Sequence, residues 1–263
     1  MQNKSIAELF NFARKTAVVT GGAMGIGYGI VLRFLEAGAN VVVADLDEKV
    51  GNEKSEVLKK DGKNVLFVKT DVSSEKEVKN LIAQTLDHFS GLDIFVNNAG
   101  IYPQKPVLEM DLALWEKIQA VNLRSVFLCC REAAKVMIKK GGGNIINIGS
   151  IDSLHPSMVG LAAYDTSKHG VWGFTKNFAL EVAGKGIRVN AIAPGGINTE
   201  GVAKIMGGGE QVKSVIKQFA EKVPLGRFGE PDDIAMAALF CASEASAYMT
   251  GEIIVIDGGV LLK

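Results

Sequence analysis

Short runs of apolar, mostly β-branched residues recur along the chain and are separated by longer segments with a mixed pattern. Polar residues rarely interrupt these runs, which is typical of parallel strands that helices cover on both faces. Strands are therefore expected at 16–22, 40–45, 64–71, 92–100, 143–150, 187–196 and 252–259.

The segments between these runs repeat apolar residues every three or four positions, which is the period of a helix with one buried face. The clearest of them are 25–38, 74–90, 111–140, 163–184 and 231–244. Alternating strands and helices predict the α/β class. More specifically, they predict a Rossmann-like doubly wound parallel sheet of seven strands with helices on both faces.

No linker, internal repeat or low-complexity segment divides the 263 residues. We therefore expect a single domain over 15–263, preceded by an N-terminal arm over 1–14 that packs on this domain or on a neighbouring subunit. The segment at about 199–215 contains three consecutive glycines and follows the end of an expected strand. Ligands bind at that end of such sheets, so this segment is expected to be a substrate lid, with an ordinary surface loop as the alternative.

The composition argues against several classes of protein. Lys and Arg together number 29, as do Asp and Glu, so no basic field favours nucleic acid or an anionic membrane as a partner. No apolar run reaches the ~18 residues of a membrane-spanning helix, and the N-terminal residues lack the apolar core of a secretory signal. Three cysteines without metal-ligand spacing and three histidines without a cluster predict a reduced, cytoplasmic protein without a metal site.

A glycine-rich turn, "TGGAMGIG" at 20–27, connects the first expected strand to the first expected helix. Gly21, Gly25 and Gly27 allow a tight turn and a close approach of the backbone to a pyrophosphate, which the positive end of a helix favours. Asp45 follows Gly25 by 20 positions, at the end of the second strand. A carboxylate there can accept hydrogen bonds from the ribose hydroxyls and repels a 2′-phosphate, so the predicted cofactor is NAD rather than NADP.

Three further motifs occur in a fixed order: "NNAG" at 97–100, a serine at 150, and Tyr164 four residues before Lys168. Together with the glycine turn they resemble the short-chain dehydrogenase/reductase family, over about residues 14 to 260. The resemblance implies an NAD-dependent oxidoreductase. It also implies a set of cofactor-binding residues: Gly21, Met24, Gly25, Ile26, Gly27, Asp45, Leu46, Asp71, Val72, Asn98, Ala99, Gly100, Tyr164, Lys168, Pro194, Gly195, Ile197 and Thr199.

Within that set, the resemblance places Asp71 at the adenine ring. It places the Ile197 backbone and the Thr199 hydroxyl at the nicotinamide. It also implies a catalytic tetrad of Asn122, Ser150, Tyr164 and Lys168.

Elementary chemistry explains the roles in this tetrad. Residues four apart share one helix face, so the Lys168 ammonium can lie near the Tyr164 hydroxyl and lower its pKa. Tyr164 would then act as general acid and base, Ser150 would hydrogen-bond the substrate oxygen, and Asn122 would position water for a proton relay to Lys168. Ser153 is the alternative catalytic serine.

Candidate substrate contacts are Ser150 together with Asp152 and His155 in the following loop, and Ile205 and Met206 on the expected lid. Polar residues in that loop favour a small hydroxylated substrate, such as a polyol, a sugar or a hydroxyketone. The reaction would interconvert a secondary alcohol and a ketone. Two alternatives stay open: a 3-oxoacyl-thioester reductase, and a non-catalytic protein that senses the dinucleotide.

The C-terminal segment 224–259 resembles the part of the family that builds subunit contacts, and its last expected strand is almost entirely apolar. A homotetramer is therefore expected, with a homodimer as the alternative.

Overall fold

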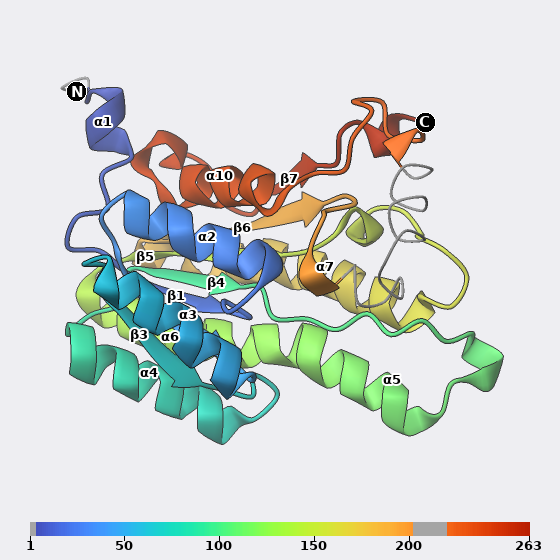
Figure 1. Ribbon diagram of the computed structural model, residues 1–263, viewed down its shortest axis with the longest axis horizontal. Helices are drawn as coiled ribbons and strands as arrows, with labels where there is room; N and C mark the ends of the chain where they lie inside the picture. Colours follow the sequence, from blue (N-terminus) through green and yellow to red (C-terminus); the bar gives the residue numbers. More distant parts are fainter. Residues whose placement is uncertain (1–3, 202–219) are drawn as a thin grey trace.

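The computed structural model describes residues 4–201 and 220–263. Seven parallel strands form one sheet in the order β3-β2-β1-β4-β5-β6-β7 (Figure 1). The predicted fold class is confirmed, and each expected strand is present. Their bounds are β1 Thr16–Thr20, β2 Asn40–Asp45, β3 Val65–Lys69, β4 Ile94–Asn97, β5 Gly143–Ile148, β6 Ile187–Pro194 and β7 Ile253–Ile256.

Side chains of each strand alternate between the two faces of the sheet. In β1, Ala17 and Val19 belong to the core on one face and Val18 to the core on the other. The first core packs against α2 (Gly25–Glu36), α3 (Glu48–Lys60) and α10 (Pro231–Ala242). The second packs against α4 (Glu75–Phe89), α6 (Ser125–Lys140) and α7 (Ala162–Val182). Because both faces are covered, the strands read as apolar runs.

Helix α3 was not among the expected helices. Its sequence, "EKVGNEKSEVLKK", is dominated by charged residues, and it buries only Gly51, Ser55 and Leu58. Asp47 stabilises its start by accepting a hydrogen bond from the Val50 amide at 3.1 Å, as N-cap residues do. A helix that buries so few side chains has little apolar periodicity, so the sequence pattern does not predict it.

The helix expected at 111–140 is divided into three parts. Helix α5 (Leu112–Gln119) is followed by a π-helical turn, Ala120–Arg124, before α6 begins at Ser125. A π-turn holds an extra residue and frequently marks a functional position. Asn122, a member of the expected tetrad, lies within it.

Six of the seven predicted strands extend beyond the observed ones at their carboxyl ends, and the strand expected at 40–45 has the predicted bounds. The expected strand 92–100 is observed as β4, Ile94–Asn97. Asn98 leaves the sheet because its amide and side chain turn toward the end of β1, where its Nδ2 donates to the carbonyl of Thr20 at 3.0 Å. The residues after these strand ends therefore form loops instead of further sheet.

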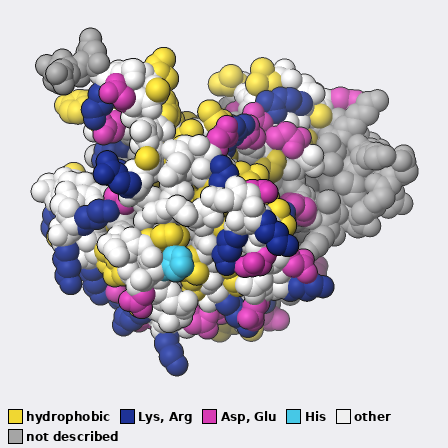
Figure 2. Space-filling model, turned by 60° about the vertical axis from the view of Figure 1, so that its left-hand side comes forward, with side chains coloured by type: hydrophobic (Ala, Val, Ile, Leu, Met, Phe, Trp, Pro, Cys, Tyr) yellow, Lys and Arg dark blue, Asp and Glu magenta, His cyan; other side chains and the backbone are white. Residues whose placement is uncertain are grey.

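The N-terminal arm contains the short helix α1 (Ile6–Leu9) and packs on the domain through Phe12. The ring centres of Phe12 and Phe34 lie 5.8 Å apart. Lys4 forms an ion pair with Glu244, which follows α10. Figure 2 shows acidic and basic side chains intermixed over the visible face, as the equal numbers of the two charges suggest. No helix among the described residues is both long and apolar enough to cross a bilayer.

Candidate active site

Most of the residues singled out in the sequence lie near the carboxyl ends of β1, β4, β5 and β6, and Asp45 and Asp71 lie at those of β2 and β3. Strands β2 and β3 follow on one side of β1, and β4 to β7 follow on its other side. The strand order therefore reverses between β1 and β4, and ligands bind at such a switch point. A Cβ placed on Gly100 would lie 3.4 Å from Asn122 Oδ1 and 3.8 Å from Lys168 Nζ. Residues from three separate parts of the chain thus meet beside the loop that follows β4.

The glycine-rich turn has the geometry expected of a phosphate-binding loop. Gly21 and Gly25 have φ angles of +61° and +53°, which side chains disfavour. A Cβ on Gly27 would lie 2.0 Å from the Gly21 carbonyl oxygen, so only glycine allows α2 to approach the turn so closely. Met24 precedes the helix without a side-chain cap, which leaves backbone N–H groups at its start available for an anion.

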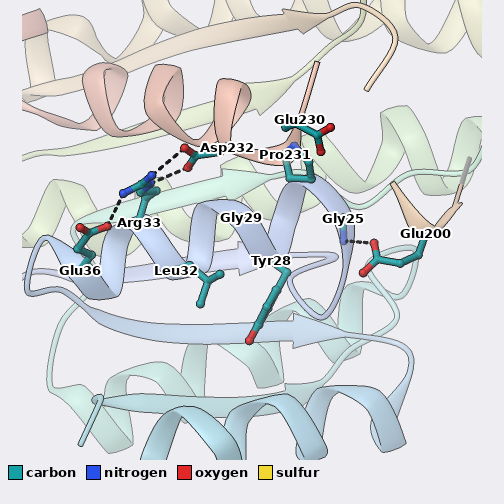
Figure 3. A pocket seen from close by; sticks show the side chains of 10 residues that line it. All are labelled: Gly25, Tyr28, Gly29, Leu32, Arg33, Glu36, Glu200, Glu230, Pro231 and Asp232. Atoms are coloured by element: carbon teal, nitrogen blue, oxygen red, sulfur yellow. Dashed lines mark hydrogen bonds and ion pairs between the residues drawn. The ribbon is translucent and has the colours of Figure 1, made fainter. Parts of the chain in front are cut away.

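A carboxylate of the protein itself already contacts this helix start. The Gly25 amide donates to Glu200 Oε2 at 3.0 Å, and Figure 3 shows the glutamate pointing at this amide. Glu200, Gly25 and Tyr28 line a hollow of about 480 Å³ between α2 and the start of α10. The hollow adjoins the expected pyrophosphate position and is not lined by Tyr164. The turn therefore fits the negatively charged pyrophosphate of a dinucleotide.

The segment after β4 holds this turn in place. Asn98 Nδ2 donates to the carbonyls of Thr20 and Gly21, both at 3.0 Å. Thr20 Oγ1 accepts from the amides of Asn98 and Ala99 at 3.0 and 3.2 Å. Asn98 and Ala99 therefore lie against the glycine turn, and the Asn98 side chain and both amides support this turn.

The carboxylates expected at the adenosine end lie at the carboxyl ends of β2 and β3. Asp45 accepts hydrogen bonds from the amides of Ala23 and Asp47, both at 3.0 Å, and so ties β2 to the glycine turn. Asp71 accepts from the Ser73 amide and hydroxyl at 2.9 and 2.7 Å. Leu46 is exposed and Val72 is buried beside them.

Asn122 is 1% exposed, and its side chain clamps one residue of the loop after β4. Its Oδ1 accepts from the Ile101 amide and its Nδ2 donates to the Ile101 carbonyl, both at 2.8 Å. Nδ2 also donates to the Ser167 hydroxyl at 3.1 Å. Asn122 therefore connects the π-turn, the loop after β4 and α7.

Ser150 follows β5, and its hydroxyl shares hydrogen bonds with Tyr164 and with Asp152 Oδ2, the latter at 2.9 Å. Ser153, the alternative serine, is buried, and its hydroxyl accepts from the Ser150 amide at 3.2 Å. Ser153 thus shapes the turn, whereas Ser150 is the serine beside Tyr164.

Lys168 is 5% exposed, and its Nζ donates to the Ile148 carbonyl at 2.8 Å. This nitrogen lies 5.6 Å from the centre of the Tyr164 ring, so the pair forms one group on α7. Burial lowers the pKa of Lys168 to about 8, because a buried ammonium loses its hydration.

The prediction that Lys168 lowers the pKa of Tyr164 is wrong for the protein chain alone. Burial raises the pKa of Tyr164 well above its ordinary value, and the nearby charge of Asp152 adds to this. The hydrogen bond with Ser150 acts in the opposite direction but is outweighed. Desolvation disfavours the charged form of both the tyrosine and the lysine, so each is pushed toward neutrality.

The expected nicotinamide turn begins at the end of β6. Pro194 is the buried last residue of β6, and the Gly195 amide donates to the Ile256 carbonyl at 2.9 Å. Ile197 is buried and pairs with Gly229. A Cβ on Gly25 would lie 3.3 Å from the Thr199 side chain. The turn after β6 therefore reaches the start of α2.

The expected substrate residues are only partly brought to this site. Asp152 is half-buried beside Ser150, and burial raises the pKa of its carboxyl group. His155 is exposed, and its Nδ1 contacts the Pro156 carbonyl at 2.8 Å. Ile205, Met206 and most of the expected lid lie outside the described residues.

Comparisons with known proteins agree with this geometry. A family model described as "Enoyl-(Acyl carrier protein) reductase" matches residues 21–261. The 3-oxoacyl-(acyl-carrier-protein) reductase FabG of Chlamydia pneumoniae is 40% identical over 246 residues, 94% of this chain and 96% of that protein. The 2,5-dichloro-2,5-cyclohexadiene-1,4-diol dehydrogenase LinX of Sphingobium indicum is 38% identical over 247 residues, 94% of this chain and 96% of that protein.

A solved short-chain type dehydrogenase/reductase from Mycobacterium marinum superposes with a TM-score of 0.91 at 36% identity, covering 98% of this chain and 100% of that one. The chain belongs to the short-chain dehydrogenase/reductase family. It is therefore an oxidoreductase of this type, and the family typically uses a nicotinamide dinucleotide.

Two residues at the candidate site were missed by the sequence analysis. Glu200 reaches the start of α2, and Tyr102 lies with its ring edge-on to Tyr164, 6.1 Å between ring centres. Tyr102 follows the "NNAG" motif by two positions, which was its one available signal. Within the described residues, no group of three or more His, Cys, Asp or Glu side chains could hold a metal ion.

Proposed function

We propose that this protein is an NAD(H)-dependent oxidoreductase that interconverts a secondary alcohol and a ketone, with Tyr164 as general acid and base. The observation that carries the proposal is the arrangement of Ser150 and Lys168 around the half-buried Tyr164. When bound, the nicotinamide ring supplies the carrier of the hydride. The glycine turn, Asp45, Asp71 and the turn after β6 are the residues that would hold the dinucleotide.

The chain's own residues supply the proton and orient the substrate. Because burial raises the pKa of Tyr164, its hydroxyl keeps a proton at neutral pH that it can donate to a carbonyl oxygen. Ser150 has a single proton, which it donates to Asp152 Oδ2 in the structure. When this proton turns to the substrate, it makes a second hydrogen bond to the same oxygen, where negative charge develops, a contribution of ~3 kcal/mol at comparable sites. In the reverse direction the alcohol proton passes to the tyrosinate, which the hydrogen bond with Ser150 stabilises.

The proposed substrate is small and hydroxylated. Support comes from the half-buried carboxyl group of Asp152 next to Ser150, since it can accept a hydrogen bond from a second hydroxyl of the substrate. The relative LinX is named as a diol dehydrogenase. The relatives named FabG favour a second candidate, reduction of a 3-oxoacyl thioester.

The proposal extends to a cytoplasmic homotetramer. The last strand of the sheet, β7, supports it, because the side chain of Val255 is 38% exposed and its apolar neighbours are half-buried. An apolar edge of this kind suits a subunit contact.

The test is turnover by the Tyr164→Phe variant with NADH and a panel of ketones, hydroxyketones and 3-oxoacyl thioesters. We expect the variant to lose at least about a hundredfold in kcat, as removal of a general acid does, and to keep its affinity for NADH. Tyr248→Phe, on a fully exposed tyrosine, is the matched control. A Tyr164→Phe variant that retains more than a few per cent of kcat would exclude the proposed role. Binding of NADH by the natural protein without turnover of any panel member would favour a sensor.

A further inference from the structure

Tyr102 connects two parts of the site that come from different strands. Its ring packs edge-on against Tyr164 of α7, with 6.1 Å between ring centres and 65° between ring planes. Its hydroxyl shares a hydrogen bond with the side chain of Thr199, in the turn after β6. A Cβ on Gly201 would lie 2.9 Å from the same hydroxyl oxygen. One side chain thus spans from the acid–base tyrosine to the turn expected to hold the nicotinamide.

The backbone of Tyr102 is held by its neighbour Ile101. Both the amide and the carbonyl of Ile101 are bonded to the Asn122 side chain at 2.8 Å. Asn122 itself is buried in the π-turn, so the start of this loop has little freedom to move. Tyr102 is also half-buried, which limits the positions that its ring can take.

The hydrogen bond between Tyr102 and Thr199 can determine where the Thr199 hydroxyl points its own proton. A threonine hydroxyl has one proton to donate and can accept two hydrogen bonds. A phenol has a pKa of about 10, so at neutral pH the Tyr102 hydroxyl carries a proton that it can donate to Thr199 Oγ1. The proton of Thr199 is then left to be donated elsewhere, toward the polar group of a bound nicotinamide.

We propose that Tyr102 is a positioning residue that aligns the Thr199 hydroxyl, and through it the nicotinamide end of the cofactor, relative to Tyr164. This inference rests on the proposed dinucleotide site. It does not depend on the substrate or on the catalytic role of Tyr164, because it can be measured by NADH binding alone.

The experiment compares Tyr102→Phe in three backgrounds: the natural protein, Thr199→Val and Thr199→Ser. NADH affinity is measured by fluorescence titration without substrate. Removing one neutral hydrogen bond should weaken NADH binding about fivefold in the natural protein. The same change should have no effect in the Thr199→Val background, which lacks the hydroxyl, and should again weaken binding about fivefold in Thr199→Ser, which retains it.

Tyr248→Phe serves as the control in each background, and circular dichroism shows whether each variant is folded. Equal weakening by Tyr102→Phe in the valine and natural backgrounds would show that the tyrosine acts through packing and would overturn the proposal. No weakening in any background would overturn it as well. If the tyrosine variant fails to fold, the Thr199 variants decide alone: Thr199→Ser must then bind NADH as the natural protein does and Thr199→Val at least fivefold more weakly. Equal affinities of these two variants would contradict the proposal. If Tyr164→Phe proves active, the proposed catalytic role of Tyr164 is excluded, but the NADH affinities of the Tyr102 and Thr199 variants still test the role of Tyr102.

Discussion

Burial controls ionisation at three neighbouring side chains of the candidate site. It raises the pKa of Tyr164 and of Asp152 and lowers that of Lys168. The charge of Asp152 also acts on both partners, because it raises the pKa of Tyr164 and of Lys168. Asp152 therefore adjusts the pH range of the acid–base pair without belonging to it.

Replacing Asp152 by Asn should lower the pKa of Tyr164, since a nearby negative charge disfavours the tyrosinate. Alcohol oxidation needs the deprotonated tyrosine, so its rate should begin to rise at a lower pH in Asp152→Asn than in the natural protein. The measurement is the pH profile of kcat/KM for oxidation. Asp87→Asn, on an exposed face of α4, is the control. An unchanged profile, or a shift to higher pH, would contradict this assignment.

The residues that reach the candidate site lie at the ends of strands or at irregular points of helices. Strand β2 ends at Asp45, whose carboxylate ties this end to the glycine turn through the Ala23 amide. The π-turn places Asn122 against the loop after β4. In each case a residue at an irregular point of an element makes the contact, because regular backbone has already paired its own N–H and C=O groups.

The end of β2 should decide between the two nicotinamide dinucleotides. Asp45→Ala should reduce the preference for NADH over NADPH by about tenfold, because a hydrogen bond to a charged group is lost, and Asp45→Arg should reverse the preference. The readout is the ratio of kcat/KM for the two cofactors, since loss of the Ala23 contact affects both alike. Asp47→Ala, which removes the cap of α3, should leave the ratio unchanged. A constant ratio in the Asp45 variants would remove the NAD assignment.

At the scale of the whole molecule, the charges balance at 29 of each sign. Stability should therefore respond to pH mainly through groups whose pKa changes on folding. Lys168 is such a group, with a pKa lowered from 10.5 to about 8. Between these values the unfolded chain binds more protons than the folded one, so stability rises with pH. Tyr164, with its raised pKa, acts in the opposite direction above about pH 10.

Between pH 8 and 10 the buried Cys129, Cys130 and Cys241, whose pKa values burial raises, act against Lys168. The contribution of Lys168 is therefore measured as a difference between the natural protein and a variant in which these cysteines are unchanged. The free energy of unfolding of the natural protein should rise relative to that of Lys168→Met by up to ~1.4 kcal/mol per pH unit in this window. Urea denaturation at pH 7, 8, 9 and 10 measures the difference. Lys139→Met, an exposed lysine at the end of α6, should show no such trend. A flat difference for Lys168→Met would mean that the amine is solvated in the folded protein.

Local patterns in the sequence were sufficient for the order and type of most elements, for the glycine turn and for the placement of Ser150, Tyr164 and Lys168 on their loop and helix. Periodicity and turn chemistry depend on residues within a few positions of one another, so one sequence contains them. The weak stripe of α3 and the extra residue of the π-turn leave no such local trace.

The tertiary structure alone decided which strand ends lie together and how deeply each side chain is buried. Tyr102 meets Thr199, and Gly25 meets Glu200, across 97 and 175 residues of chain. The direction of the Tyr164 pKa shift likewise depends on the loss of water around the phenol. Contacts and desolvation of this kind arise from the packing of distant segments, and no pattern of neighbouring residues specifies them.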